Sequence, residues 1–465
     1  MASLLLMGGR VIDPASGRDE VGDLVIEGGL IARIGPPGFA RAEPGFAVAK
    51  PGSLKGAERV LDCCGRIVSP GFIDLHVHFR EPPVAGADLA ALPETIETGA
   101  ASAVAGGFTT VCAMPNTDPP MDSAEAVAYY IRRGRETGLA RVLPIGAMTR
   151  RRAGREPADM DAMKAAGAVA FSDDGSDVAD AKVFEAVLRR AATLPPSPAG
   201  LRRTGGAVAI CHCEDARLAA GGTVNDGLMT LALGLPGIPA EAEEAAVERA
   251  CRLARATGCR VHVCHVSTAG AVESLRRAKS AGAPVTVEAT PHHLALTHEA
   301  LRSRDPVFKV SPPLRSASDV AAVVEAVRDG TIDCLATDHA PHSAAAKARG
   351  LVAAPPGMIG LESALAVYVR ALIEPGILAW PDLIARLTLN PARILDLDAG
   401  TLAVGAAADV TVIDPEAEWT IEPERFVSRA RNCPFAGWMV KGRVKWTLVG
   451  GRIAYEDQCQ HYSPI

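Results

Sequence analysis

Two histidines separated by one residue, His76 and His78, are the first part of the chain whose spacing could support chemistry. They follow a strand-like apolar run that begins at Ile67. Because alternate residues of a strand point to the same side, the two imidazoles would face one site together. Such a pair can bind a metal ion, and the alternative is two partly buried rings that bond only to backbone. The pair alone does not decide between these interpretations.

Four later segments carry further histidines and carboxylates, each directly after a strand-like run. They are Ser172-Asp173-Asp174-Gly175, Cys211-His212-Cys213-Glu214-Asp215, His262-Val263-Cys264-His265-Val266-Ser267 and Asp338-His339-Ala340-Pro341-His342. Taken singly, the Asp-Asp-Gly segment is typical of a turn, the Cys-His-Cys segment could be core thiols around one histidine, and Asp338 could cap a helix. Taken together, imidazoles and carboxylates at successive strand ends, without four clustered thiols, favour one or two catalytic Zn²⁺ ions.

A metal site of this composition can support hydrolysis at a carbonyl group that carries a nitrogen leaving group. Zn²⁺ lowers the pKa of a bound water to about 7 and polarises the carbonyl group under attack. A carboxylate close to that water can take its proton and pass it to the departing nitrogen. Asp338 is our candidate for this proton transfer, with helix capping as its alternative role.

The elements that would position these groups alternate between strands and helices. Short apolar runs occur at Ile67–Leu75, Thr109–Met114, Arg141–Ile145, Ala168–Ser172, Ala207–Cys213, Arg260–Val266, Val285–Ala289 and Cys334–Thr337, with amphipathic segments such as Ala124–Arg135, Ala240–Thr257 and Ser318–Arg328 between them. Eight such strands predict an α/β fold, a (β/α)8 TIM barrel. The active site of such a barrel lies at the carboxyl ends of its strands, where the histidines and carboxylates fall.

Both ends of the chain differ from this middle. The stretch 4–34 contains short strand-like runs separated by Gly-Gly and Pro-Gly turns, and 408–414 and 444–455 show the same pattern. We therefore expect a small composite β-sandwich domain formed by residues 1–65 and 401–465, and a metal-dependent barrel over residues 66–400. Residues 36–57 and the Pro-rich run 195–198 are expected loops.

The composition excludes several classes of protein. Of 465 residues, 48% are hydrophobic and 22% charged, which is typical of a globular protein, and the net charge of -6 gives no basic face for nucleic acid. The sequence contains no run of about 18 apolar residues that could cross a membrane, and its N-terminus is a poor signal peptide. The 11 cysteines therefore indicate reduced thiols in the cytoplasm.

The chain resembles the amidohydrolase superfamily and, within it, the class I dihydroorotases, over nearly its whole length. The resemblance rests on Pro70-Gly71-Phe72-Ile73-Asp74-Leu75-His76-Val77-His78-Phe79-Arg80-Glu81-Pro82, Gly106-Gly107-Phe108-Thr109-Thr110, Met114-Pro115-Asn116-Thr117, Thr290-Pro291-His292-His293-Leu294, Pro312-Pro313-Leu314-Arg315 and the strand-end segments above. Any one piece is unspecific, whereas the set is specific. It implies a cyclic amide hydrolase that reversibly converts N-carbamoyl-L-aspartate to dihydroorotate in pyrimidine synthesis, and we expect a homo-oligomer.

The resemblance also implies a role for each matched position. One metal would be bound by His76 and His78 and a second by His212 and His265, with Asp174 bridging them and Asp338 touching a metal as the acid–base group. The substrate would be held by Arg80, Asn116 and His342, together with His78, Ser311 and the backbone around Pro356 and Gly357. An arginine suits this task because its fork forms paired charge-assisted bonds with a carboxylate. His262 is expected to be a strand residue rather than a ligand, and His292 and His293 are expected to support the site rather than bind metal.

Two positions depart from the family pattern. Ser311 stands where members usually carry Asn before Pro-Pro-Leu-Arg, and its shorter side chain puts that substrate contact in question. Pro83 stands where Gly usually follows Arg-Glu-Pro, which can alter the loop beside Arg80.

Two other functions stay open at this point. Another cyclic amidohydrolase, such as an allantoinase or dihydropyrimidinase, usually places a carboxylated lysine in the fourth strand, and Ala168–Ser172 contains none. Some relatives are inactive partner subunits of aspartate transcarbamoylase that have lost metal ligands. Every ligand position is filled here, which favours an enzyme and leaves that association as an additional role.

Overall fold

The computed structural model describes residues 3–39, 59–83, 88–195 and 206–458. Most of the loop expected at 36–57 and of the Pro-rich run at 195–198 lies outside the described residues. None of the helices in these ranges is both long and apolar enough to cross a membrane.

A barrel of parallel strands forms the centre of the molecule. In the described part of the chain, its sheet contains β6 (Phe72–Val77), β7 (Phe108–Ala113), β8 (Arg141–Ala147), β9 (Ala170–Ser172), β10 (Ala209–Cys211), β13 (Val261–Val263), β14 (Val285–Ala289) and β15 (Cys334–Leu335), paired in that order. The two edge strands approach each other through a parallel bridge between Val77 and His339, where the His78 amide donates to the His339 carbonyl oxygen at 2.8 Å. The predicted TIM barrel is confirmed.

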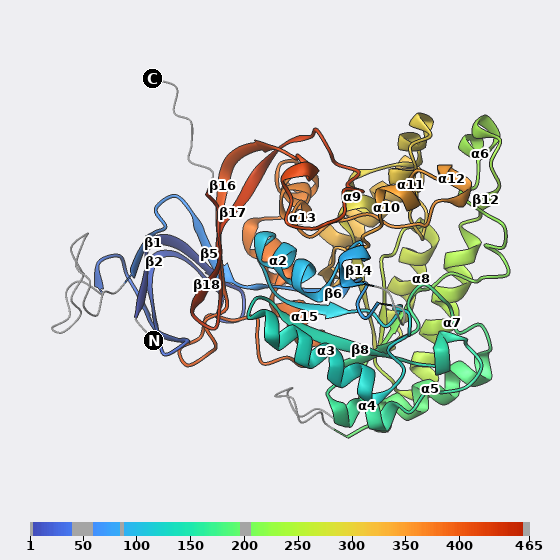
Figure 1. The fold of residues 1–465 in the computed structure, drawn as a ribbon, viewed down its shortest axis with the longest axis horizontal. Helices are drawn as coiled ribbons and strands as arrows, with labels where there is room; N and C mark the ends of the chain where they lie inside the picture. The colour runs from blue at the N-terminus through green and yellow to red at the C-terminus, as the bar shows by residue number, and fades with distance from the viewer. Residues whose placement is uncertain (1–2, 40–58, 84–87, 196–205, 459–465) are drawn as a thin grey trace.

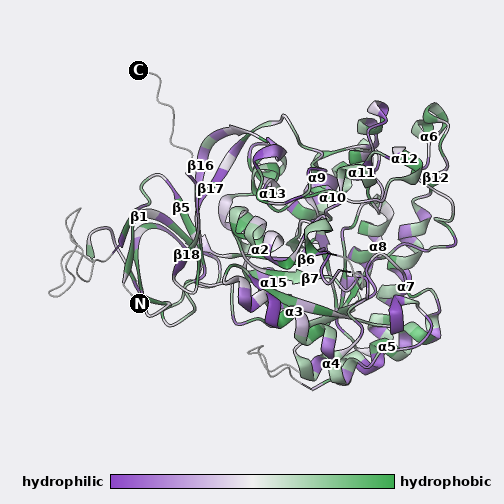
Figure 2. Cartoon of the chain, viewed as in Figure 1, coloured by the Kyte–Doolittle hydropathy of each residue, from purple (hydrophilic) through white to green (hydrophobic). Residues whose placement is uncertain are grey.

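Helices surround this barrel (Figure 1). They include α2 (Ile96–Ala105), α3 (Ala124–Thr137), α4 (Met160–Ala166), α5 (Ala181–Thr193), α7 (Glu241–Thr257), α8 (Ala269–Ser280), α10 (Ala317–Arg328), α13 (Ala364–Tyr368), α14 (Trp380–Leu387) and α15 (Leu389–Ile394). Local sequence fixes their ends: Ser123 caps the start of α3, and Gly138 ends it in the left-handed conformation. Figure 2 shows hydrophobic residues along β6 and β7 and mixed colouring on outer helices such as α3 and α5.

A second sheet joins the two ends of the chain, as Figure 1 shows. Within the described residues, β1 (Leu4–Asp13), β2 (Arg18–Glu27), β3 (Leu30–Gly35), β4 (Arg59–Asp62) and β5 (Ile67–Pro70) combine with β16 (Val410–Thr420), β17 (Met439–Val449) and β18 (Arg452–Glu456). Strand β5 lies between β1 and β16, with Val68 opposite Val412. The composite β region drawn from both termini is thus confirmed, while the domain limits at 65–66 and 400–401 stay a prediction.

Two strand predictions require correction. The run predicted as one strand over Ile67–Leu75 is divided at Gly71 between the two sheets. A Cβ atom at Gly71 would lie 2.2 Å from the Thr109 hydroxyl, so only glycine fits where the chain changes sheets. The Gly-Gly turn predicted near the N-terminus is a bulge inside the continuous strand β1, with Gly8 at φ +68°.

Candidate active site

Six side chains from five strand ends converge at the mouth of the barrel. His76 and His78 lie at the end of β6, Asp174 after β9, His212 after β10, His265 after β13 and Asp338 after β15. Because parallel strands of a barrel end at one rim, residues far apart in sequence meet there. All six side chains are buried. The structure therefore brings together every residue predicted as a metal ligand, while their roles stay a prediction.

One half of the centre consists of His76, His78 and Asp338. The Nε2 atoms of the two histidines lie 3.2 Å apart. The Oδ1 atom of Asp338 lies 2.9 Å from the His78 Nε2 atom and 3.5 Å from the His76 Nε2 atom. The three ligand atoms thus surround one point.

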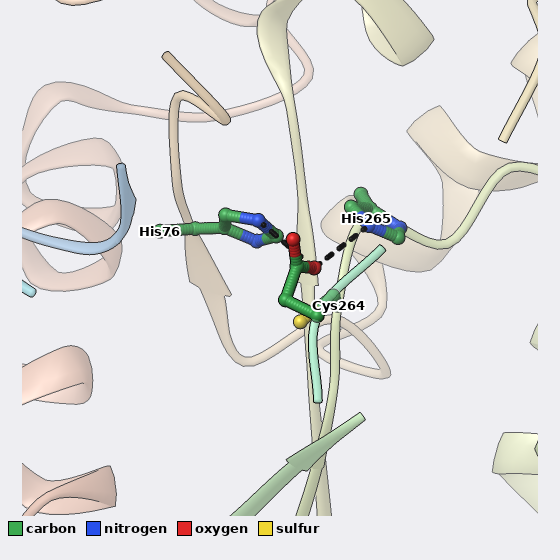
Figure 3. Close-up of side chains that lie close together, drawn as sticks. His76, Cys264 and His265 are labelled. Atoms are coloured by element: carbon green, nitrogen blue, oxygen red, sulfur yellow. Dashed lines mark ion pairs between the residues drawn. The ribbon is translucent and has the colours of Figure 1, made fainter. Parts of the chain in front are cut away.

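The other half consists of His212 and His265, whose Nδ1 and Nε2 atoms lie 3.0 Å apart. The Oδ1 atom of Asp174 stands between the halves, 3.4 Å from the His76 Nε2 atom, 3.7 Å from the His212 Nδ1 atom and 4.0 Å from the His265 Nε2 atom. Figure 3 labels the His76 and His265 rings, and its dashed lines mark ion pairs such as those that both rings form with Asp174. The geometry fits the predicted bridging position of Asp174.

A test of metal fit is whether buried donor atoms lack protein partners. Asp174 Oδ1 is buried and has no hydrogen-bond partner among the described residues. An unpaired buried carboxylate oxygen is costly, and a cation within reach of it and the facing histidine nitrogens would remove that cost. Imidazole and carboxylate donors suit Zn²⁺ and related divalent ions. The residues present therefore fit one or two divalent metal ions.

The charge states of Asp174 and His265 also suit metal binding. Burial disfavours the ionised Asp174 carboxylate, but the neighbouring His76, His78 and His212 outweigh burial and hold its pKa well below the usual range. Burial, with His212 and His76 nearby, holds the pKa of His265 well below its ordinary value. Asp174 is consequently ionised and His265 neutral, the states that ligands need.

The backbone is strained where two of these residues attach. Asp338 has a backbone φ of +48° and His265 has one of +31°, values that residues other than glycine rarely adopt. Asp338 does not cap a helix, since the next helix, α11 (Ala344–Lys347), is capped by Ser343. Asp74 holds the first and last strand ends together: it accepts from the His76 amide at 3.0 Å and from the Thr337 hydroxyl at 2.6 Å.

A cavity of about 210 Å³ opens directly over the centre. It is lined by five of the six ligand candidates and by Arg80, Asn116, Gly175, Val310, Ser311, Ala340, His342, Pro355, Pro356 and Gly357. A larger cavity of about 520 Å³ lies between α2 and β16 to β18, but it contains no converging histidines. The chemistry of the lining, rather than size, identifies the smaller cavity as the candidate active site.

Two predicted substrate contacts, Arg80 and His342, are held in place by hydrogen bonds to backbone carbonyl groups. Arg80 donates from its Nε atom to the Pro341 carbonyl oxygen at 3.1 Å. Burial, reinforced by Arg80, lowers the pKa of His342 to about 3, and its Nε2–H donates to the Pro356 carbonyl oxygen at 2.8 Å. The neutral ring of His342 therefore keeps Nδ1 as an acceptor for a ligand N–H group.

The other predicted substrate-binding residues, Asn116, Ser311 and Gly357, line the cavity and also contact neighbouring protein groups. Asn116 accepts from the His78 Nδ1–H at 2.7 Å and donates to Asp174 Oδ2 at 3.2 Å. Ser311 donates to the Glu214 carboxylate at 3.2 Å. Gly357 has φ +132°, and a Cβ atom there would lie 2.9 Å from the His342 Nε2 atom, so glycine is required beside that ring.

Sequence reasoning missed several residues that contact the centre. Glu288 accepts from the His76 Nδ1–H at 2.7 Å, and Arg152 donates to the carbonyl oxygen of Asp174. The Cys264 thiol lies beside His76 and His265, where Figure 3 shows its sulfur. Glu288 stands in an alternating strand and Cys264 in an apolar one, so no local pattern distinguishes them from core residues.

Solved structures identify the fold. An L-hydantoinase (dihydropyrimidinase) from Arthrobacter aurescens superposes with a TM-score of 0.79 at 25% identity, covering 98% of this chain and 96% of that one. A dihydropyrimidinase from Brevibacillus agri gives a TM-score of 0.77 at 21% identity and shares the fold. The barrel and its site thus define an amidohydrolase of the metal-dependent superfamily.

Proteins of similar sequence show which family of amidohydrolases the chain belongs to. The family model described as Dihydro-orotase-like matches residues 65–271. A dihydroorotase from Pelotomaculum thermopropionicum is 46% identical over 455 residues, covering 98% of this chain and 99% of that one. A dihydroorotase from Geobacter metallireducens is 41% identical over 454 residues, covering 98% and 100%. The chain belongs to the dihydroorotase family.

Proposed function

We propose that this protein is a cytoplasmic dihydroorotase that converts N-carbamoyl-L-aspartate reversibly to dihydroorotate, using one or two Zn²⁺ ions. One observation carries the proposal: four histidines and two carboxylates converge at one site, beneath a cavity lined by five of them and by Arg80. The identity of 46% to a dihydroorotase along almost the whole chain supports this substrate over other cyclic amides. The fourth strand, β9, with no lysine, agrees with this choice.

The cavity residues divide the reaction between binding and proton transfer. A bound divalent ion would polarise the ring carbonyl and make a water acidic. Arg80 binds the ring carboxylate, and Asn116 and His342 hold the ring amide groups. During hydrolysis, Asp338 takes a proton from the attacking water and delivers it to the ring nitrogen as the carbon–nitrogen bond breaks. During ring closure, Asp338 takes the proton from the carbamoyl nitrogen and returns it to the departing water.

The assembly of the protein is a separate part of the proposal. We expect a homo-oligomer, and association with aspartate transcarbamoylase remains an additional prediction. Light scattering of the purified chain, alone and mixed with that enzyme, tests both. The monomer mass for the chain alone would contradict the homo-oligomer, and unchanged masses of the two proteins in the mixture would contradict their association.

The activity is tested with the purified protein, zinc-loaded, on dihydroorotate, hydantoin and allantoin. We expect turnover of dihydroorotate, which is lost on chelation and returns when Zn²⁺ is added. Preferred turnover of hydantoin or allantoin would assign the chain to another cyclic amidohydrolase activity. Dihydroorotate turnover no faster than that of an Asp338→Ala variant would refute the proposed reaction.

A further inference from the structure

A buried carboxylate on β14 connects two histidines in the barrel interior. The Oε1 atom of Glu288 lies 2.7 Å from the His76 Nδ1 atom, and its Oε2 atom lies 3.0 Å from the His262 Nε2 atom. His262, on β13, extends this row of hydrogen bonds, because its Nδ1 atom lies 2.8 Å from the Thr286 hydroxyl. Glu288, His76 and His262 have no exposed surface. A continuous row of hydrogen bonds thus leads from Thr286 to the candidate metal centre.

The direction of each hydrogen bond in this row follows from the carboxylate. An ionised carboxylate only accepts, so the two ring nitrogens that face Glu288 must carry protons. His76 protonated on Nδ1 has its lone pair on Nε2, the atom that faces His78, Asp174 and Asp338. His262 protonated on Nε2 has its lone pair on Nδ1, where it accepts from the Thr286 hydroxyl. Every donor in the row therefore has an acceptor.

We propose that Glu288 is a positioning residue that holds His76 in the tautomer and orientation needed to bind a metal through Nε2, and that His262 anchors Glu288. The inference rests on the metal site of the proposed function, but it concerns metal binding and not the identity of the substrate. A carboxylate that bonds the outer nitrogen of a ligand histidine typically changes metal affinity about 10- to 100-fold.

A competing interpretation is that His262, Glu288 and Cys334 form a second metal site, because their ligand atoms lie close together. Both oxygens of Glu288 and both nitrogens of His262 already take part in the hydrogen bonds given above. A metal in this group would have to displace them. The geometry therefore favours support of His76 over a separate ion.

The proposal predicts an effect on one half of the centre only. The rings of His212 and His265 contact Asp174 and each other, and among the described residues no second carboxylate forms an ion pair with them. Loss of Glu288 should therefore weaken the metal at His76 and His78 and leave the metal at His212 and His265 nearly unchanged.

The experiment titrates the metal-free full-length protein with Co²⁺, in competition with a chromophoric chelator, and records the visible Co²⁺ spectrum. We expect Glu288→Gln to weaken one Co²⁺ equivalent by about 10- to 100-fold and to change its spectrum. His262→Asn should give a smaller loss at the same equivalent. Glu362→Gln is the matched control, since this partly buried carboxylate accepts from the Ser102 hydroxyl and from the Val427 and Ser428 amides, none of which is a candidate metal ligand.

Three results would overturn the proposal: wild-type affinity for both equivalents in Glu288→Gln, equal weakening of both, or an equal loss in the Glu362→Gln control. Wild-type protein labelled with ¹⁵N-histidine provides a measurement that needs no variant. His76 loaded with Zn²⁺ should show a protonated Nδ1, and metal bound through Nδ1 would contradict the proposal. If Glu288→Gln weakens one metal equivalent as expected but the wild-type enzyme does not turn over dihydroorotate, the proposed function is refuted and this inference stands.

Discussion

In the half of the centre formed by His76 and His78, each ring has its outer nitrogen bonded, to Glu288 and to Asn116 respectively. In the half formed by His212 and His265, the described residues offer no carboxylate or amide side chain to the outer ring nitrogens. The first pair comes from one strand, the second from two strands 53 residues apart. The first half is therefore oriented before metal arrives, whereas the second depends on Asp174 and on the metal itself.

Asp174 is the residue that both halves share, so its removal should have the largest effect. We expect Asp174→Ala to lose both metal equivalents and to reduce dihydroorotate hydrolysis to background. The reason is that its carboxylate is the only negative charge within 4 Å of His76, His212 and His265 together in the described part of the chain. Metal analysis and a hydrolysis assay measure both effects. Retention of one full equivalent would show that the halves are independent.

Asp338 belongs to the first half, where it lies close to the His76 and His78 rings. We expect Asp338→Asn to reduce kcat by about 10³-fold, because asparagine keeps an oxygen toward the metal but cannot transfer the proton. Metal content should stay at the wild-type value, which separates proton transfer from metal binding. Steady-state kinetics with dihydroorotate provides the measurement. A kcat within a few-fold of wild type would assign the proton transfer to another group.

Arg80, two residues beyond His78, tests whether the first half also carries the substrate contact. We expect Arg80→Lys to raise KM for dihydroorotate by about 10- to 100-fold, since a lysine cannot reproduce the paired bonds of a guanidinium to a carboxylate. Metal affinity should not change. Arg132→Lys on the surface of α3 is the control, and an unchanged KM in Arg80→Lys would place the carboxylate elsewhere.

The smallest expected effect is a difference in metal release. On slow chelation of the zinc-loaded enzyme, we expect the metal of the second half to leave about 10-fold faster, because the Glu288 and Asn116 contacts hold only the first pair of histidines. Stopped-flow release with a coloured chelator resolves the two phases. In Glu288→Gln the two rates should approach each other, and a single phase in the wild type would contradict the comparison.

Much of this site was predictable because its information is local. The strand-end positions of His76, His78, His212 and His265 follow from alternating apolar runs, and a parallel barrel brings such ends to one rim. The exchange of sheets at Gly71 could not be predicted in this way. The run on both sides of Gly71 reads as one strand, and only the approach of Thr109 shows why it divides.

The sequence by itself determined the fold class, the identity of the candidate ligands and the arginine beside them, because strand periodicity and residue type are properties of short segments. Only the tertiary structure decided which nitrogen of each histidine faces the centre, and which residues hold it there. The contact between His76 and Glu288 spans 212 positions, and that between Asp74 and Thr337 spans 263. Contacts of this kind form when the barrel closes, and no spacing within one segment records them.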